Sequence, residues 1–385
     1  MSGTRRRVTI LGAAATSVVA GVALLPNWSA GAAVSDDPTV DARTRATFQR
    51  LADAVFTDRT NALVDGGRAD EDKPLTDGFS GDVTLSSGTA RTEDATLSAL
   101  GQRRESLAKA GETYRGASTT VTLNATRVTG RTAKADVTET TTLTYARARG
   151  DAPKTTGFQA RHELTFKADR HGDWRLTGIR ETDQGGLAVN TLSKPAPVKV
   201  ATAADNTTPN APRAAITRNP VAAPKTGTTY DYKAMAAYAE KHWNVYNTDY
   251  PDFGGRGAGG DCTNFVSQAL KAGGWKHVPG YVYDYTRWFG NADIQSHSFI
   301  GVNEWSWFAQ NSKRTTPLAN VFQMEVGDVL QLDFDRDGSK DHTMIVTYKS
   351  RGVPYVTYHS NDTFRRSVAS LVASYPNAYY YAYRT

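Results

Sequence analysis

Residues 261–270 read DCTNFVSQAL, and this stretch decides how the second half of the chain folds. It follows a glycine-rich run, GGRGAGG, at residues 254–260, and a glycine pair at 273–274 closes it. Four apolar side chains recur at helical spacing and share one face: Phe265, Val266, Ala269 and Leu270. The pattern predicts a helix that begins at Cys262, with Asp261 as its N-cap and a glycine at its end.

Cys262 is the only cysteine in 385 residues, which excludes a disulfide framework and a cysteine-rich zinc site. The first N–H groups of a helix and its dipole favour a thiolate over a thiol, and they can hold an oxyanion on an acyl carbon. The other interpretation is a buried structural cysteine, a common fate of free thiols. Because Gly259, Gly260 and Asp261 precede it and suit the edge of a cleft, we interpret Cys262 as a nucleophile.

A nucleophilic cysteine needs a base, and two histidines lie at suitable strand ends. His342 opens the apolar stretch TMIV, and His359 closes the stretch YVTY. If the two strands pair as a hairpin across residues 350–352, both histidines lie at the same end of the sheet. One can then take the thiol proton while the other orients it. His277 and His297 lack such flanking strands, and we interpret them as ordinary surface histidines.

The second half of the chain, residues 229–385, holds five of the seven histidines and the cysteine, so we expect the chemistry there. Periodicity predicts helices at 230–246, 262–272 and 302–311. It predicts strands at 329–334, 343–348, 355–358 and 378–383. Helices packed on an antiparallel sheet give an α+β domain.

An ordered series of motifs runs through this half: Asn247-x-x-Tyr250, GGDCTNFVSQ ending at Gln268, Ala272-Gly273-Gly274, Trp305-x-Trp307, Gly327-Asp328-Val329, Asp341-His342 and His359-Ser360-Asn361-Asp362. Together they resemble the amidase domain of secreted bacterial proteins, a branch of the papain-like cysteine amidases and peptidases that includes the NlpC and CHAP types. The string DCTNFVSQ is specific, and the other pieces gain weight from their order. The resemblance implies a papain-like fold and hydrolysis of amide bonds.

The resemblance also implies roles for single residues. Cys262 matches the nucleophile, and His342 matches the general base. His359 falls where NlpC-type enzymes place a third polar residue, which implies that it orients His342. Asn361 and Asp362 remain alternatives for the orienting role, since papain-type enzymes use an amide there.

Two further residues are candidates for contact with the oxyanion or the substrate. Tyr250 lies twelve residues before Cys262, where related enzymes have a tyrosine near the oxyanion. The aromatic residue that should follow it directly is shifted to Phe253. Asn247 is a second candidate in the same loop.

The first 33 residues have the three parts of a secretory signal: a basic start at Arg5–Arg7, an apolar run to Leu25 and a small-residue exit at Ala30–Ala32. We expect residues 1–33 to be a signal peptide, removed by either the Sec or the twin-arginine route. The mature protein is then secreted and extracellular, and it has no stable membrane insertion. A non-cleaved anchor is the alternative.

Residues 34–188 predict a smaller α+β domain. Helical spacing appears at 41–64 and 93–114, and strand alternation follows at 119–125, 135–145, 158–166 and 174–179. Helices followed by a meander of long strands loosely resemble the cone-shaped NTF2-like fold. No motif in this segment assigns it a task.

Residues 189–228 hold six prolines and carry a net charge of +4, which predicts an extended linker that lets the two domains move independently. The leader carries +3, residues 34–188 carry −1 and residues 229–385 carry zero. The basic excess therefore lies outside the predicted domains, and no folded region has the basic face that nucleic-acid binding needs.

An acidic stretch, Asp333, Asp335 and Asp337, matches the first half of a calcium loop. Met344 stands where the ligand at the twelfth position is needed, so the complete motif fails. We interpret the stretch as a tight turn before His342 and expect neither a metal nor a cofactor.

The sequence therefore predicts a secreted cysteine amidase or peptidase that cleaves amide bonds in peptides or in cell-wall peptidoglycan. It would lie outside the cell, in contact with the wall. The alternative is a non-catalytic wall- or glycan-binding protein on the same papain-like scaffold.

Overall fold

The computed structural model describes residues 40–66, 74–78, 83–148, 150–183, 187–192, 211–223, 230–253 and 261–385. The predicted signal peptide, the glycine run at 254–260 and most of the predicted linker lie outside these residues. Among the described residues, no helix is both long and apolar enough to cross a membrane.

The described residues of the first half form two long helices and five strands. Asp41 caps α1 (Ala42–Asn61), accepting a hydrogen bond from the Thr44 N–H at 2.7 Å, and Ser86 caps α2 (Ser87–Lys109). A 3-10 turn, η1, covers Leu75–Gly78. The strands are β1 (Val83–Leu85), β2 (Tyr114–Thr129), β3 (Thr132–Tyr145), β4 (Thr155–Ala168) and β5 (Trp174–Glu181).

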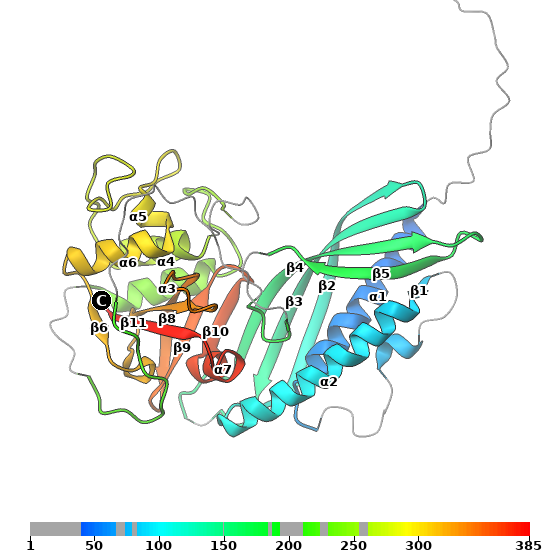
Figure 1. The fold of residues 1–385 in the computed structure, drawn as a ribbon, viewed down its shortest axis with the longest axis horizontal. Helices are drawn as coiled ribbons and strands as arrows, with labels where there is room; N and C mark the ends of the chain where they lie inside the picture. Colours follow the sequence, from blue (N-terminus) through cyan, green and yellow to red (C-terminus); the bar gives the residue numbers. More distant parts are fainter. Residues whose placement is uncertain are drawn as a thin grey trace, which may run out of the picture. The chain divides into compact units, whose positions relative to one another are not determined.

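Strands β2 to β5 form the predicted antiparallel meander, and β1 joins β5 in parallel. Figure 1 shows α1 and α2 lying across the strands of this sheet. The ring of Phe48 in α1 stacks on Phe166 of β4, with 3.8 Å between centroids, and Trp174 packs edge-on against Phe48. These rings are buried in one cluster between the helices and the sheet.

Within its described residues, the second half has five helices and six strands. The helices are α3 (Tyr232–His242), α4 (Cys262–Ala272), α5 (His297–Ile300), α6 (Val302–Asn311) and α7 (Val368–Ser374), with a 3-10 turn, η2, at Val321–Gln323. The strands are β6 (Thr316–Leu318), β7 (Val329–Asp333), β8 (His342–Ser350), β9 (Val353–Tyr358), β10 (Thr363–Ser367) and β11 (Tyr379–Arg384). The predicted α+β class is confirmed.

The strands of the second half pair in the order β10-β9-β8-β7-β11-β6, and all these pairs are antiparallel. The predicted hairpin between β8 and β9 forms: Ser350 pairs with Val353 across a turn in which Arg351 and Gly352 have φ of 49° and 76°. The start of β8 and the end of β9 therefore lie at the same end of the sheet.

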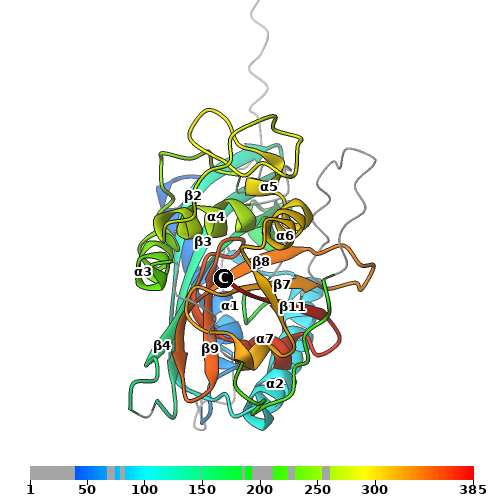
Figure 2. The ribbon, with the colours of Figure 1, turned by 90° about the vertical axis from the view of Figure 1, so that its left-hand side faces the viewer.

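The two faces of this sheet are covered by different helices. Figure 2 shows α3, α4 and α6 on one side of β8, and α7 belongs to the core on the other side. Side chains alternate along β8. Thr343 and Ile345 face α4, where the Thr343 hydroxyl lies 2.8 Å from that of Thr263. Met344 and Val346 pack in the core that contains α7.

One sheet continues through both halves. β5 covers β4 only from His162 onward, and β10 pairs with the earlier part of β4, aligning Thr363 with Phe158. The linker segment also packs: the Ala214 N–H donates to the Tyr380 carbonyl at 2.7 Å. Residues 38–385 accordingly form one compact unit, and independent movement of the two domains stays a prediction. An edge strand can pair with any exposed strand, and the composition of the chain does not reveal that β4 pairs with β10.

Candidate active site

Cys262 is the first residue of α4 and Asp261 occupies its N-cap position, as predicted, but the Asp261 side chain does not cap the helix. The Asp261 side chain makes no capping hydrogen bond. One carboxylate oxygen accepts from the Asn264 amide at 2.8 Å and from the Phe253 N–H at 3.3 Å, and the other lies 2.5 Å from Nδ1 of His359. The side-chain hydrogen bond typical of an N-cap does not form because the carboxylate has a stronger, charged partner.

The Cys262 thiol is enclosed, with 1% of the residue exposed. Its sulfur lies 3.8 Å from the Thr263 hydroxyl, and the Thr343 backbone N–H also interacts with it. Burial raises the pKa of the thiol to about 11, although both of these contacts favour the thiolate. The thiolate expected from the helix N-terminus is therefore not the resting state, because desolvation outweighs the helix end.

His342 opens β8, and alternation along the strand assigns it to the face opposite Thr343. Its ring meets Tyr358 edge-on at 5.2 Å. Burial, and after it the charge on His359, lower the pKa of the His342 imidazole to about 3, so the ring is neutral. Its Nε2 has no hydrogen-bond partner in the described part of the chain. In the described structure, no hydrogen bond joins Cys262 to His342.

His359 follows β9 and is held on the α4 side of the sheet. Its ring stacks between Tyr246 and Phe265, with centroid distances of 4.1 and 4.0 Å. Nδ1 donates to Asp261, and Nε2 donates to the carbonyl of His242, the last residue of α3, at 2.9 Å. Both partners are acceptors, so the ring donates from both nitrogens as an imidazolium.

The surroundings of His359 support that charge. Burial opposes it, but the hydrogen bond to Asp261 and the charges of Asp362 and Asp261 outweigh burial and raise the pKa of His359. The carbonyl end of α3 adds the negative end of a helix dipole. With both ring nitrogens engaged, His359 is not hydrogen-bonded to His342, and the predicted relay between the two histidines does not form.

Asn361 and Asp362, the alternative orienters, face the first half of the chain instead of the thiol. The Asn361 side-chain oxygen accepts from the backbone of Leu187 and Ala188, and its amide donates to Glu181 and Asp183. One Asp362 oxygen accepts from the Tyr246 hydroxyl at 2.8 Å, and the other lies 3.6 Å from the Arg161 guanidinium. Neither side chain is bonded to His342.

Tyr250 and Asn247 do not meet at the thiol either. The Tyr250 hydroxyl accepts from Lys271, which lies at the opposite end of α4 from Cys262. Nine residues of helix separate those ends by roughly 13 Å. The Asn247 amide donates to the Tyr238 hydroxyl at 2.8 Å. The structure thus joins His359 to Asp261, the residue before the thiol, and places the N–H of Thr343, the residue after His342, at the thiol, whereas Tyr250 and Asn247 have partners elsewhere.

The acidic stretch forms the predicted tight turn between β7 and β8. Asp333 accepts from the backbone N–H groups of Arg336 and Gly338, and Asp341 accepts from Phe334 at 2.7 Å. Carboxylate oxygens of Asp333, Asp335 and Asp341 lie within 4.8 Å of one another. Asp337, the remaining acidic residue of the stretch, is outside this group.

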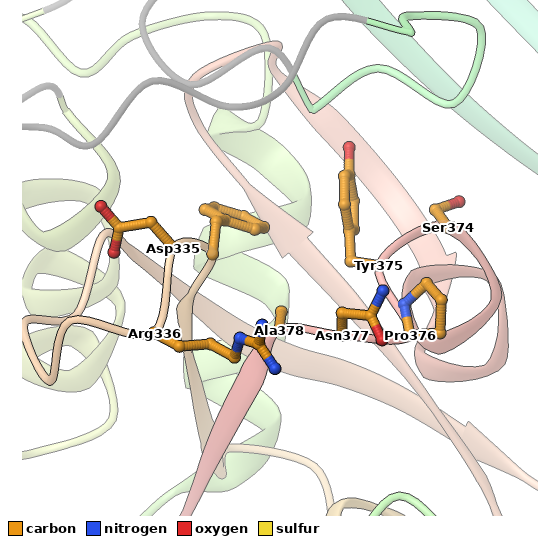
Figure 3. Close-up of a pocket in the computed structure, with 8 residues that line it drawn as sticks. Asp335, Arg336, Ser374, Tyr375, Pro376, Asn377 and Ala378 are labelled. Carbon is orange, nitrogen blue, oxygen red and sulfur yellow. The ribbon is translucent and has the colours of Figure 1, made fainter.

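A pocket of about 440 Å³ lies beside this turn, away from Cys262. Figure 3 shows Asp335 and Arg336 on one side and Tyr375, Pro376 and Asn377 on the other. None of the predicted catalytic residues lines it. Its volume suits a small molecule, but the thiol chemistry is not there.

Sequence reasoning misses two contributors to the site, Asp261 as the partner of His359 and Tyr246 as its stacking platform. A carboxylate directly beside the cysteine is the available signal for the first. Because the pair joins residues 98 positions apart, spacing along the chain does not reveal it. Tyr246 has no signal of its own beyond lying at the end of a predicted helix.

Comparison with known proteins finds matches to the half of the chain that contains these residues. Residues 229–383 match the family model described as "Putative amidase domain", which supports the resemblance to an amidase domain expected for the second half. The protein YhbB of Bacillus subtilis (strain 168), titled uncharacterized, is 33% identical over 141 residues, which are 36% of this chain and 43% of YhbB. YjcM of the same organism, also titled uncharacterized, is 30% identical over 140 residues, 34% of this chain and 31% of YjcM.

The chain thus spans less than half the length of these curated relatives. Among solved structures, the intermembrane space region of the chloroplast protein ARC6 is 14% identical, covers 37% of this chain and 98% of its own, and has a TM-score of 0.24. At that score the likeness carries no argument about fold or function.

Proposed function

We propose that the protein is a cysteine amidase or peptidase, with Cys262 as nucleophile and His342 as general base and acid. One observation carries the proposal. The thiol lies at the first residue of α4 and interacts with the backbone N–H of Thr343, and the residue before Thr343 in β8 is His342, whose neutral ring has an unpartnered Nε2 in the described structure. The amidase-domain match over residues 229–383 supports the reaction class.

The reaction begins when the Cys262 sulfur attacks an amide carbonyl and its proton passes to the His342 imidazole. The tetrahedral oxyanion meets the first N–H groups of α4, which have no partners within the helix. His342 then protonates the leaving amine as the C–N bond breaks. Water, deprotonated by the same imidazole, cleaves the thioester and restores the thiol.

Proton transfer requires the two resting pKa values to approach each other. Burial is the first cause of both shifts, since it raises the pKa of the thiol to about 11 and lowers that of the imidazole to about 3. Substrate amide or water that enters the site restores polar surroundings and reverses both effects. In this proposal the thiolate forms on substrate binding instead of standing preformed.

We propose peptide amides of the cell wall as the substrate class, because the predicted export would place the enzyme there. The first prediction tests this with the full chain on soluble peptidoglycan fragments and small peptide amides. Cys262→Ala should reduce turnover to background, and His342→Gln should reduce it by at least ~100-fold. His171→Gln, on an exposed turn of the first half, is the control. Wild-type turnover by Cys262→Ala would contradict the mechanism.

A second function, a non-catalytic wall-binding protein, is favoured by one observation: reactive cysteines are usually accessible, yet Cys262 is buried. Iodoacetamide separates the two, because the chain has a single thiol and intact mass reports its modification alone. Because the resting thiol is protonated, alkylation of the native protein is measured near pH 9, and alkylation that His342→Gln slows supports catalysis. Alkylation only after unfolding supports the binding protein.

A further inference from the structure

The first half of the chain contributes an arginine close to the candidate active site. Arg161 lies on β4, just beyond the residues that pair with β10. Its guanidinium contacts two carboxylates, Asp183 at 3.2 Å and Asp362 at 3.6 Å. Asp362 directly precedes β10 and is buried, whereas the Arg161 side chain is 44% exposed.

The Asp362 carboxylate accepts few hydrogen bonds that would stabilise its charge. Its Oδ1 accepts from the Tyr246 hydroxyl, but its Oδ2 accepts no hydrogen bond in the described structure. Burial raises the pKa of Asp362 to about 6, and the charges of His359 and Arg161 oppose that rise. A buried carboxylate with one free oxygen depends strongly on its neighbouring cations.

Asp362 is in turn connected to the catalytic neighbourhood. Tyr246 donates to Asp362 and stacks on the His359 ring, and the Arg161 guanidinium lies 5.9 Å from the centre of the same tyrosine ring. His359 bonds to Asp261, the residue directly before Cys262. A continuous set of contacts therefore runs from β4 to the residue before the thiol.

We propose that Arg161 is a positioning residue that keeps the buried Asp362 carboxylate ionised. Through that charge the first half helps Asp261 to hold His359 as an imidazolium beside the thiol. Arg161 lies outside the residues that match the amidase model, so the electrostatics of the site depend on a part of the chain that the family does not include. The catalytic meaning of this inference rests on the proposed function, whereas the charge link does not.

The groups that face these residues come from several elements. Asp362 faces Arg161 of β4, Asp183 after β5, Tyr246 after α3 and His359. His359 itself faces Asp261, the α3 carbonyl end and His342. Arg161 is the cation among these groups that originates in the first half.

The test uses full-length protein labelled with ¹⁵N-histidine, and the His359 signal is assigned by its loss in His359→Gln. Arg161→Met should lower the pKa of His359 by about one unit, a tenfold change in its proton affinity, because Asp362 then takes up a proton near neutral pH. Arg161→Lys should restore most of the shift. The matched control is Arg180→Met, which removes an exposed arginine of β5 that pairs with Glu163 of β4. It should leave the pKa of His359 unchanged.

If Arg161→Met does not fold, Arg161→Gln removes the charge while keeping a polar side chain, and the same shift is expected. The proposal would be overturned if His359 has the same pKa in the folded Arg161→Met or Arg161→Gln variant as in Arg180→Met. The second readout is the pH profile of hydrolysis, whose alkaline limb should move to lower pH with the His359 pKa. If the pKa of His359 changes but the alkaline limb of the pH profile does not, only the catalytic role of this charge link is overturned. Failure of hydrolysis in wild-type protein counts against the proposed function, and the NMR result still decides the charge link.

Discussion

At the scale of single residues, His342 makes the stability of the fold depend on pH. Its folded-state pKa is about 3, whereas its ordinary value is 6.5. Below pH 6.5 the unfolded chain binds a proton that the folded chain excludes, so stability falls as the pH drops toward 3. The slope from this one group is about 1.4 kcal/mol per pH unit.

We therefore predict that wild-type protein loses about 2–3 kcal/mol more free energy of unfolding than His342→Gln between pH 6 and pH 4. Urea unfolding at a series of pH values measures the difference, and His171→Gln serves as the variant that should follow wild type. Parallel curves for wild type and His342→Gln would show that the ring is hydrated and titrates normally.

Residues also mark the limit of what sequence predicts at this site. The positions of Cys262, His342 and His359 follow from local patterns: a helix start and the two ends of a hairpin. Their protonation does not, because it depends on burial and on partners far along the chain. The pair of Asp261 and His359 replaces the predicted relay for that reason.

At the scale of elements, strongly periodic segments are predicted correctly from the sequence, whereas short strands with charged residues are not. The prediction of a helix over 302–311 matches α6, and the helix opened by Cys262 matches α4. β10 was not predicted, because it is five residues long and contains Arg365 and Arg366. Arg365 pairs with Glu240 of α3, and Arg366 is buried against the Leu187 carbonyl and the Tyr358 hydroxyl. Only tertiary partners make such a strand stable.

The contact between α3 and α4 gives an element-scale prediction. A Cβ added at Gly273, which ends α4, would overlap the Met235 side chain of α3 and would lie 2.9 Å from the carbonyl of Asp231, the residue before α3. Gly273→Ala should therefore destabilise the fold by about 1–3 kcal/mol through overpacking. Gly101→Ala, inside α2 with open space around it, should instead stabilise by about 0.5–1 kcal/mol. Equal shifts of the urea midpoints in the two variants would contradict the packing argument.

At the scale of the whole molecule, Asn361 joins the two halves. Its side chain makes four hydrogen bonds to residues of the segment 181–188, and its φ of 61° lies in the left-handed region that asparagine tolerates. Losing these bonds leaves buried donors and acceptors without partners. Asn361 is therefore one of the side chains through which the second half binds the end of the first half.

Asn361→Gly keeps the backbone conformation available while it removes the side chain. We predict a loss of about 2–4 kcal/mol in the free energy of unfolding, and faster amide hydrogen exchange at Leu187 and Ala188. Asn124→Ala, which removes an exposed hydrogen bond to Thr138, should change neither. Unchanged exchange at the two amides would mean that other contacts hold the segment.

The ladder between β4 and β10 also imposes an order on folding. Phe158 and Thr363 pair across 205 residues of chain, whereas the hairpins of β2 to β5 close over short turns. Loop closure of that span costs more entropy, so the hairpins form first and β10 docks late. Until it docks, the early part of β4 is an unpaired edge that can accept a strand from another chain. The yield of refolded protein should therefore fall as its concentration rises, with β4 as the place where chains first join.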